Sequence, residues 1–305
     1  MSAIPEHIRQ IAAPGVILHA LERNPHGSPA LLFLHGYLDH CRGFDWMIEA
    51  LPAAWRTIAL DFRGHGRSGH VTGGLYHLTD YLADVEFTLD ACGVQRVHLV
   101  GHSLGGTVAI LYAAGRPDRV LSLTAIESLG PPTVGRDRTV ERLRQYVRDL
   151  HKPSLKRVYS SVDAAAARMR ENNPSLSEAA ALHFARHGTQ PVEGGVQFTF
   201  DPAHRRRFGV ALDESQTLAY LGAVECPRLV IAGSRGLLAT DGGGALHQLH
   251  ERRQNRISLG DDRVRARLAA LRARDPVRID GGHHVHLDSP AEVARALASF
   301  VSAQL

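Results

Sequence analysis

The sequence has few cysteines, no long apolar run and only a small net charge. Cys41, Cys92 and Cys226 are the only cysteines in 305 residues, and no two of them have C-x-x-C spacing. This argues against a disulfide framework or a zinc site and favours a reducing compartment. No stretch approaches the roughly 18 apolar residues that span a bilayer. Glu6 and Arg9 interrupt the place where a secretory signal would need an apolar core. We therefore expect a cytoplasmic protein with no membrane partner.

The net charge of +4 arises in the middle of the chain. Residues 130–222 carry 14 Lys and Arg against 10 Asp and Glu, so the flanking segments together are neutral. A basic patch can attract nucleic acid. The longest basic run, however, is only Arg205, Arg206 and Arg207, with little aromatic sequence around it. We expect a solvated face there and no nucleic-acid partner.

Short apolar runs alternate with helical patterns. Most of these runs are nearly continuous in apolar residues, which is typical of parallel strands covered on both faces. Helical periodicity follows at 79–92 and 104–115, and a last helix is predicted to begin with Ser289, Pro290 and Glu292 as the N-cap, first-turn proline and acid of a capping box. The predicted strands lie at 15–21, 30–36, 56–62, 97–103, 120–127, 228–233 and 276–280.

This alternation indicates an α/β protein with a doubly wound, mostly parallel sheet. A helical, Arg-rich stretch of about a hundred residues interrupts the pattern before the strand at 228–233, far more than an ordinary connection needs. We predict a core formed by residues 1–129 and 223–305, with a helical cap inserted at 130–222.

The stretch "VHLVGHSLGG" contains a single serine, Ser103, with Gly101 and Gly105 two residues away on either side. It has the G-x-S-x-G pattern of a nucleophile elbow, between a predicted strand and a predicted helix. Glycines are needed there because side chains beside so sharp a turn would collide. Such a serine needs a base, and the base needs an orienting acid.

The base is expected in "RIDGGHHVHLDSP", after the last strand. Together with "LFLHG", "DFRGHGRSG" and "GHSLGG", this segment resembles the α/β-hydrolase family over nearly the whole chain. The resemblance implies that the base lies seven residues before Pro290, which is His283, and that His284 and His286 are bystanders or line the pocket. A metal site formed by these three histidines is disfavoured, because no other ligand has supporting spacing.

The acid is harder to assign. The family's usual aspartate position in "IAGSRGLLATDGGG" holds Gly236, so the carboxylate must come from elsewhere. Related hydrolases use the end of the strand after the elbow helix, which implies Glu127; Asp241 is the fallback, and an absent acid remains a third possibility. Asp280 and Asp288 are weaker candidates because they lie close to His283 in sequence.

Asp61 is another weak candidate for the acid. We expect its carboxylate to belong instead to a structural network with Arg63, in the "DFRGHGRSG" loop.

Glu127 in "IESLGPP", with "DESQTLAYLG" and "SRGLL", makes the chain resemble the serine hydrolase-like branch of the family. We expect a serine hydrolase that cleaves a small-molecule ester or thioester through an acyl-enzyme on Ser103, with the backbone N–H groups of Leu104 and Tyr37 as oxyanion hole. No cofactor or metal is implied. A small-molecule binding protein without turnover and carbon–carbon bond hydrolysis stay open as alternatives, as do the substrate and the oligomeric state.

Overall fold

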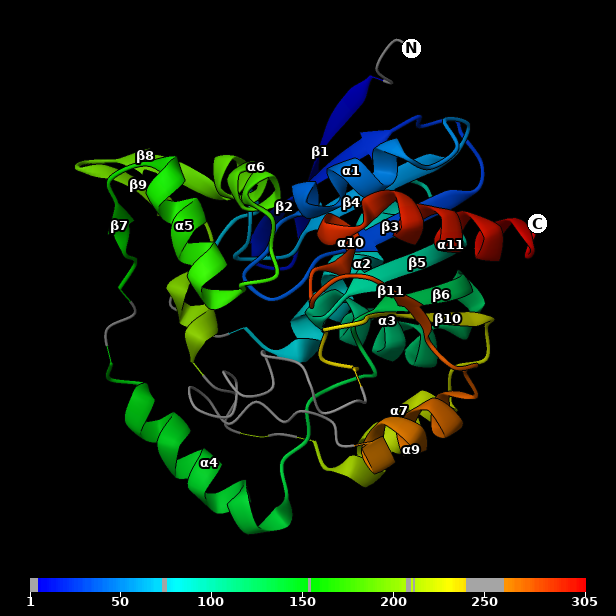
Figure 1. Cartoon of the computed structure of the whole chain (residues 1–305). Helices are drawn as coiled ribbons and strands as arrows, with labels where there is room; N and C mark the ends of the chain where they lie inside the picture. Colours follow the sequence, from blue (N-terminus) through cyan, green and yellow to red (C-terminus); the bar gives the residue numbers. More distant parts are fainter. Residues whose placement is uncertain (1–4, 73–75, 153–154, 207–209, 211, 240–260) are drawn as a thin grey trace.

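A computed structural model describes residues 5–72, 76–152, 155–206, 210, 212–239 and 261–305 (Figure 1). Its centre is an eight-stranded sheet with the order β1-β2-β4-β3-β5-β6-β10-β11. The strands from β4 to β11 in this order pair in parallel, whereas β1 and β2 are antiparallel to their neighbours. The predicted α/β class is therefore confirmed. The strands are β1 (Glu6–Ala13), β2 (Val16–Arg23), β3 (Ala30–Leu34), β4 (Arg56–Asp61), β5 (Val97–His102), β6 (Val120–Ile126), β10 (Arg228–Gly233) and β11 (Val277–Ile279).

Helices cover both faces of this sheet (Figure 1). Alternate residues of β3 divide between two cores, as the period of a strand requires: Leu32 and Leu34 belong to one, and Leu31 and Phe33 to the other. The first core includes side chains of α2 (Leu78–Ala91), α3 (Leu104–Gly115), α7 (Glu214–Gly222) and α9 (Asp261–Leu271), and the second includes side chains of α1 (Asp45–Glu49) and α11 (Pro290–Ser302).

The last helix begins at Pro290 as predicted, but the predicted capping box is wrong. The Ser289 side chain makes no cap hydrogen bond among the described residues. Its hydroxyl donates instead to the carbonyl of Asp280, at 2.7 Å. Ser289 therefore ties the start of α11 to the residue that follows β11, across the loop that carries His283.

The segment between β6 and β10 contains helices and also a small sheet that the sequence analysis did not predict. Its strands pair antiparallel in the order β7-β9-β8. The small residues of α5 and α6 pack with Phe184 in a core of their own. The elements, besides α7, are α4 (Arg136–Asp149), β7 (Val158–Tyr159), α5 (Val162–Asn172), α6 (Glu178–Gly188), β8 (Thr189–Val192), β9 (Gly195–Phe198) and the 3-10 helix η3 (Pro202–Arg205).

None of the helices in the described ranges is long and apolar enough to cross a membrane.

Candidate active site

Ser103 occupies a sharp turn between β5 and α3. Its backbone has φ 52° and ψ −109°, a combination that is unfavourable for a residue with a side chain and persists only where the surrounding structure imposes it. Two glycines permit this turn. A Cβ on Gly101 would lie 2.3 Å from the carbonyl oxygen of Gly105, and a Cβ on Gly105 would lie 1.9 Å from that of Leu34. Ser103 is thereby held at the carboxyl end of the sheet, next to the N-terminus of α3.

Three residues that are distant in sequence form a hydrogen-bonded series at this edge. Nε2 of His283 lies 3.0 Å from Oγ of Ser103, and Nδ1 of the same ring lies 3.2 Å from Oε2 of Glu127. Glu127 follows β6 and His283 follows β11, so each member comes from the carboxyl end of a different parallel strand. The imidazole therefore has a hydroxyl on one nitrogen and a carboxyl group on the other.

The Glu127 side chain is completely buried. Its carboxylate accepts hydrogen bonds from the backbone N–H of Gly233 at 2.8 Å and of Leu237 at 2.5 Å. Burial raises the pKa of Glu127 to about 7, although these hydrogen bonds act to lower it. The two amide donors fix the orientation of the carboxylate and favour its charged form.

The position of Glu127 explains why residue 236 is a glycine and carries no acid. A Cβ on Gly236 would lie 2.2 Å from Oε1 of Glu127 and 2.4 Å from its Oε2. The Glu127 carboxylate therefore fills the space that a side chain at position 236 would take. The two positions are alternatives, because one volume next to His283 admits only one carboxylate.

The predicted oxyanion-hole residues come from the adjoining segments. Leu104 is the first residue of α3, and Tyr37 follows His35 and Gly36 after β3. The close approach of Gly105 to Leu34 packs the start of α3 directly on the end of β3. The Tyr37 hydroxyl donates to the carbonyl of His204 at 2.8 Å, which connects this turn to the inserted segment.

The structure adds a buried polar cluster that the sequence analysis missed. Oδ2 of Asp39 lies 3.5 Å from Nδ1 of His102 and 3.7 Å from Nε2 of His284. His102 also donates from Nε2 to the carbonyl of His283, at 2.8 Å. Burial lowers the pKa of His284, but the Asp39 carboxylate outweighs this effect, so the net pKa is raised. The sequence signal was weak, because Asp39 belongs to no motif and His102 is the variable residue of G-x-S-x-G.

The rings of His283, His284 and His286 all pack against the ring of His102, with centroids 4.8, 5.1 and 4.2 Å apart. Nδ1 of His284 lies 2.7 Å from the side-chain nitrogen of Asn173, at the end of α5. The buried ring of His286 packs against that of Phe44, with centroids 5.1 Å apart. The three imidazoles therefore share one neighbour but differ in their further partners.

The expected pairing of Asp61 with Arg63 is wrong. Arg63 pairs with Asp84 of α2: its Nε and Nη2 donate to Oδ1 of Asp84, at 2.9 Å and 2.7 Å. The Asp61 carboxylate lies 2.9 Å from Nδ1 of His19 on β2. The sequence places Asp61 and Arg63 two residues apart, but β4 ends between them and their side chains find partners on different elements.

The remaining acid candidates have other partners or lie outside the described residues. Asp280 pairs with Arg235 at the surface. Asp288 accepts a hydrogen bond from the backbone N–H of Gly282, at 2.7 Å. Asp241 falls outside the residues that the structure describes.

Comparisons with known proteins agree with this architecture. A family model described as alpha/beta hydrolase fold matches residues 29–290. A serine hydrolase-like protein of Danio rerio is 30% identical over 290 residues, which is 92% of this chain and 83% of the relative. The crystal structure of the hypothetical protein PA1622 from Pseudomonas aeruginosa PAO1 has a TM-score of 0.81 at 31% identity, covering 97% of this chain and 98% of that one. A thioesterase domain from the curacin biosynthetic pathway has a TM-score of 0.78 at 25% identity, covering 97% and 99%.

The sheet order, the serine turn and the match over residues 29–290 show that the chain belongs to the α/β-hydrolase family and is a hydrolase. Within that family it lies in the serine hydrolase-like branch, together with relatives from Danio rerio and Homo sapiens. The resemblance seen in the sequence is therefore confirmed at both levels.

Proposed function

We propose that this chain hydrolyses a small-molecule ester or thioester through a covalent acyl-enzyme on Ser103. The observation that carries the proposal is the hydrogen-bonded series from Ser103 through His283 to Glu127. A serine hydroxyl is a weak nucleophile until a neighbouring base accepts its proton. The similarity to a thioesterase domain supports the inclusion of thioesters.

The reaction has two halves. Oγ of Ser103 attacks the carbonyl carbon while its proton passes to Nε2 of His283, and Glu127 stabilises the imidazolium that forms. The negative oxygen of the tetrahedral intermediate accepts hydrogen bonds from the backbone N–H groups of Leu104 and Tyr37. The intermediate collapses when Nε2 protonates the departing alcohol or thiol. Water then attacks the acyl-enzyme and gives its proton to His283, which passes it to Oγ of Ser103 as the acyl–oxygen bond breaks, so that the acid and free Ser103 are released.

The segment 130–222 acts in this proposal as a cap that selects the substrate. Two hydrogen bonds support this role: one joins the Tyr37 hydroxyl to the carbonyl of His204 in η3, and the other joins the side chains of His284 and Asn173, the residue after α5. Both contacts connect residues next to the proposed triad with the inserted segment. The alternative of a binding protein without turnover predicts an unreactive serine, which the following experiment tests.

Labelling with a fluorophosphonate tests the proposal directly. The serine oxygen displaces fluoride from phosphorus, so the intact mass of wild type should rise by one phosphonyl group per chain. Ser103→Ala should remain unlabelled. Ser299→Ala is the matched control, since Ser299 is an exposed residue of α11 and its loss should leave labelling unchanged. A folded wild type that takes up no label would refute the proposed acyl-enzyme on Ser103 and favour binding without turnover.

The labelling rate should also rise with pH. The reactive form needs an ionised Glu127 and a neutral His283, and burial raises the pKa of Glu127 to about 7. At low pH the pair holds an extra proton and the reaction is slow; the rate should increase as that proton is lost, with a midpoint near pH 7 that belongs to the pair. Rates measured between about pH 5 and pH 9 check this. A rate independent of pH over that range would show that this pair does not activate the serine.

A further inference from the structure

A second cluster of reactive side chains lies away from the proposed triad. It lines a small, partly open cavity where α6 meets β2, the end of β4 and the residues after Tyr37. The lining includes three imidazoles, one thiol and one carboxylate, and the proposed reaction uses none of them. These residues are His19, His40, His187, Cys41 and Asp61.

Three of these groups converge. One ring nitrogen of His19, Sγ of Cys41 and a carboxylate oxygen of Asp61 all lie within 4.8 Å of one another, and all three residues are buried. Nitrogen, sulfur and oxygen donors together are the set that Zn²⁺ takes in proteins. Cys41 is a buried cysteine outside any disulfide. Burial and the Asp61 carboxylate raise the pKa of its thiol, so a metal ion has to displace the thiol proton in order to bind.

The hydrogen bonds of two histidines leave nitrogen atoms unused. His19 lies with Nδ1 2.9 Å from the Asp61 carboxylate, and His40 donates from Nε2 to the carbonyl of Phe184 on α6 at 3.0 Å. The opposite nitrogens, Nε2 of His19 and Nδ1 of His40, are buried without a hydrogen-bond partner in the part of the chain that the structure describes. Buried polar atoms are rarely left in this state, and the described residues also include such ring nitrogens in His98, His102, His204 and His286.

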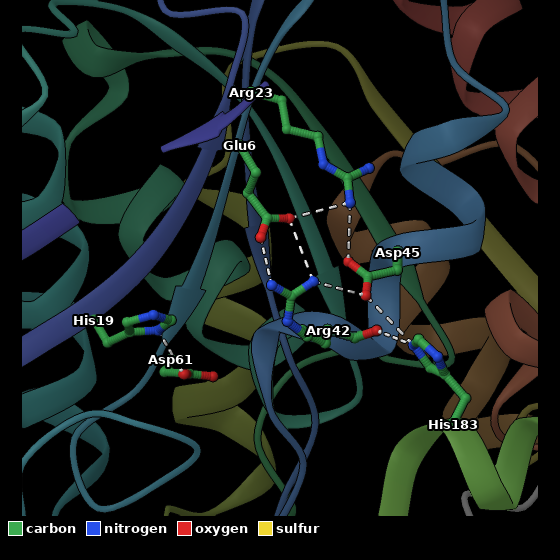
Figure 2. A network of polar contacts seen from close by, with 7 residues as sticks. All are labelled: Glu6, His19, Arg23, Arg42, Asp45, Asp61 and His183. Atoms are coloured by element: carbon green, nitrogen blue, oxygen red, sulfur yellow. Dashed lines mark hydrogen bonds and ion pairs between the residues drawn. The ribbon is translucent and has the colours of Figure 1, made fainter. Parts of the chain in front are cut away.

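Nearby positive charge does not oppose a cation here. Arg42 lines the cavity, but its guanidinium pairs with the carboxylates of Glu6 and Asp45 (Figure 2). The Arg67 side chain is exposed to water, where its charge is screened. In the same view the His19–Asp61 pair lies beside this network and takes no part in it.

We propose that this cavity is a binding site for one divalent metal ion of the zinc class, with the Cys41 thiolate and the His19 imidazole as ligands. The Asp61 carboxylate is the third ligand, since its oxygen is one of the three converging donor atoms. Binding releases the thiol proton of Cys41 to solvent as the metal–sulfur bond forms. The sequence showed no metal-binding spacing, because the donor residues come from separate elements that only the fold brings together.

Titration with Co²⁺ under reducing conditions tests this site, because Co²⁺ bound to a thiolate gives a characteristic absorption band. Wild type should bind one Co²⁺ per chain with that band, and Zn²⁺ should displace it. Cys41→Ser should lose the band and bind Co²⁺ more than about tenfold more weakly. Removing a ligand should cost at least as much affinity as removing a residue that only supports a ligand. Zn²⁺ should raise the Tm of wild type and not that of Cys41→Ser.

Two matched variants separate this site from others. Cys92→Ser removes a different buried cysteine and should keep the band. His183→Gln disrupts a second donor group in the described residues, formed by Asp45, His183 and His187, which contains no thiol; it should also keep the band. The proposal is overturned if wild type shows no saturable Co²⁺ binding. It is equally overturned if folded Cys41→Ser retains the band, or if His183→Gln abolishes it.

Discussion

Ser103→Ala is expected to lower kcat by about 10⁶-fold for any p-nitrophenyl ester or acyl thioester that wild type hydrolyses. The oxygen that forms the acyl-enzyme is removed, and His283 then has no hydroxyl to deprotonate. KM should change little, because binding does not require the covalent bond. Initial rates at saturating substrate, with the released nitrophenol or thiol followed by absorbance, check this prediction.

The fold of this variant can be verified independently. Ser103 is only half-buried and its backbone makes a hydrogen bond to Ile126 that alanine retains, so the Tm should stay close to that of wild type. Ser299→Ala again provides the control for rate and Tm. If a folded Ser103→Ala kept a tenth or more of the wild-type rate, the nucleophile would be another group and the proposed acyl-enzyme would be wrong.

Most of the sheet was predictable because its central strands are buried on both faces. The seven predicted runs, most of them nearly continuous in apolar residues, correspond to β2, β3, β4, β5, β6, β10 and β11. β1 was missed because it is an edge strand: Ile11 is its only buried residue, and half of its residues are polar. The three-stranded sheet of the inserted segment was missed for a related reason. Its strands have two to four residues and none is buried, so they carry no periodic signal.

The site was predictable where local geometry dictates the residue type. The turn at Ser103 needs glycines at 101 and 105, and that need is visible in the sequence. The proposed acid, Glu127, was harder to predict than the serine turn. Its assignment depends on the close approach of Glu127 to Gly236, and these residues are more than a hundred positions apart in the sequence. A sequence shows that position 236 has no side chain, but only the folded chain shows which carboxylate fills the space.

Glu127→Gln is expected to lower kcat by about 10³ to 10⁴-fold, the usual cost of removing the charge that orients and stabilises a catalytic imidazole. The amide has nearly the same shape but only one oxygen, so one of the two backbone donors, at Gly233 or Leu237, loses its acceptor. The Tm should therefore fall by an amount typical of one lost buried hydrogen bond, while the rate collapses. Comparison of kcat and Tm for the two proteins separates a catalytic effect from a structural one.

Moving the carboxylate provides the sharper test of the same group. Glu127→Ala empties the volume beside His283, and Gly236→Asp in that background returns a carboxylate from the other wall of the same space. We expect Glu127→Ala to be as inactive as Glu127→Gln. The double variant should have a kcat at least about tenfold higher than that of Glu127→Ala. Gly236→Asp alone should be impaired, because its side chain would collide with Glu127. Equal activity of the single Glu127→Ala variant and wild type would exclude Glu127 as the acid and leave the imidazole to be held by another carboxylate.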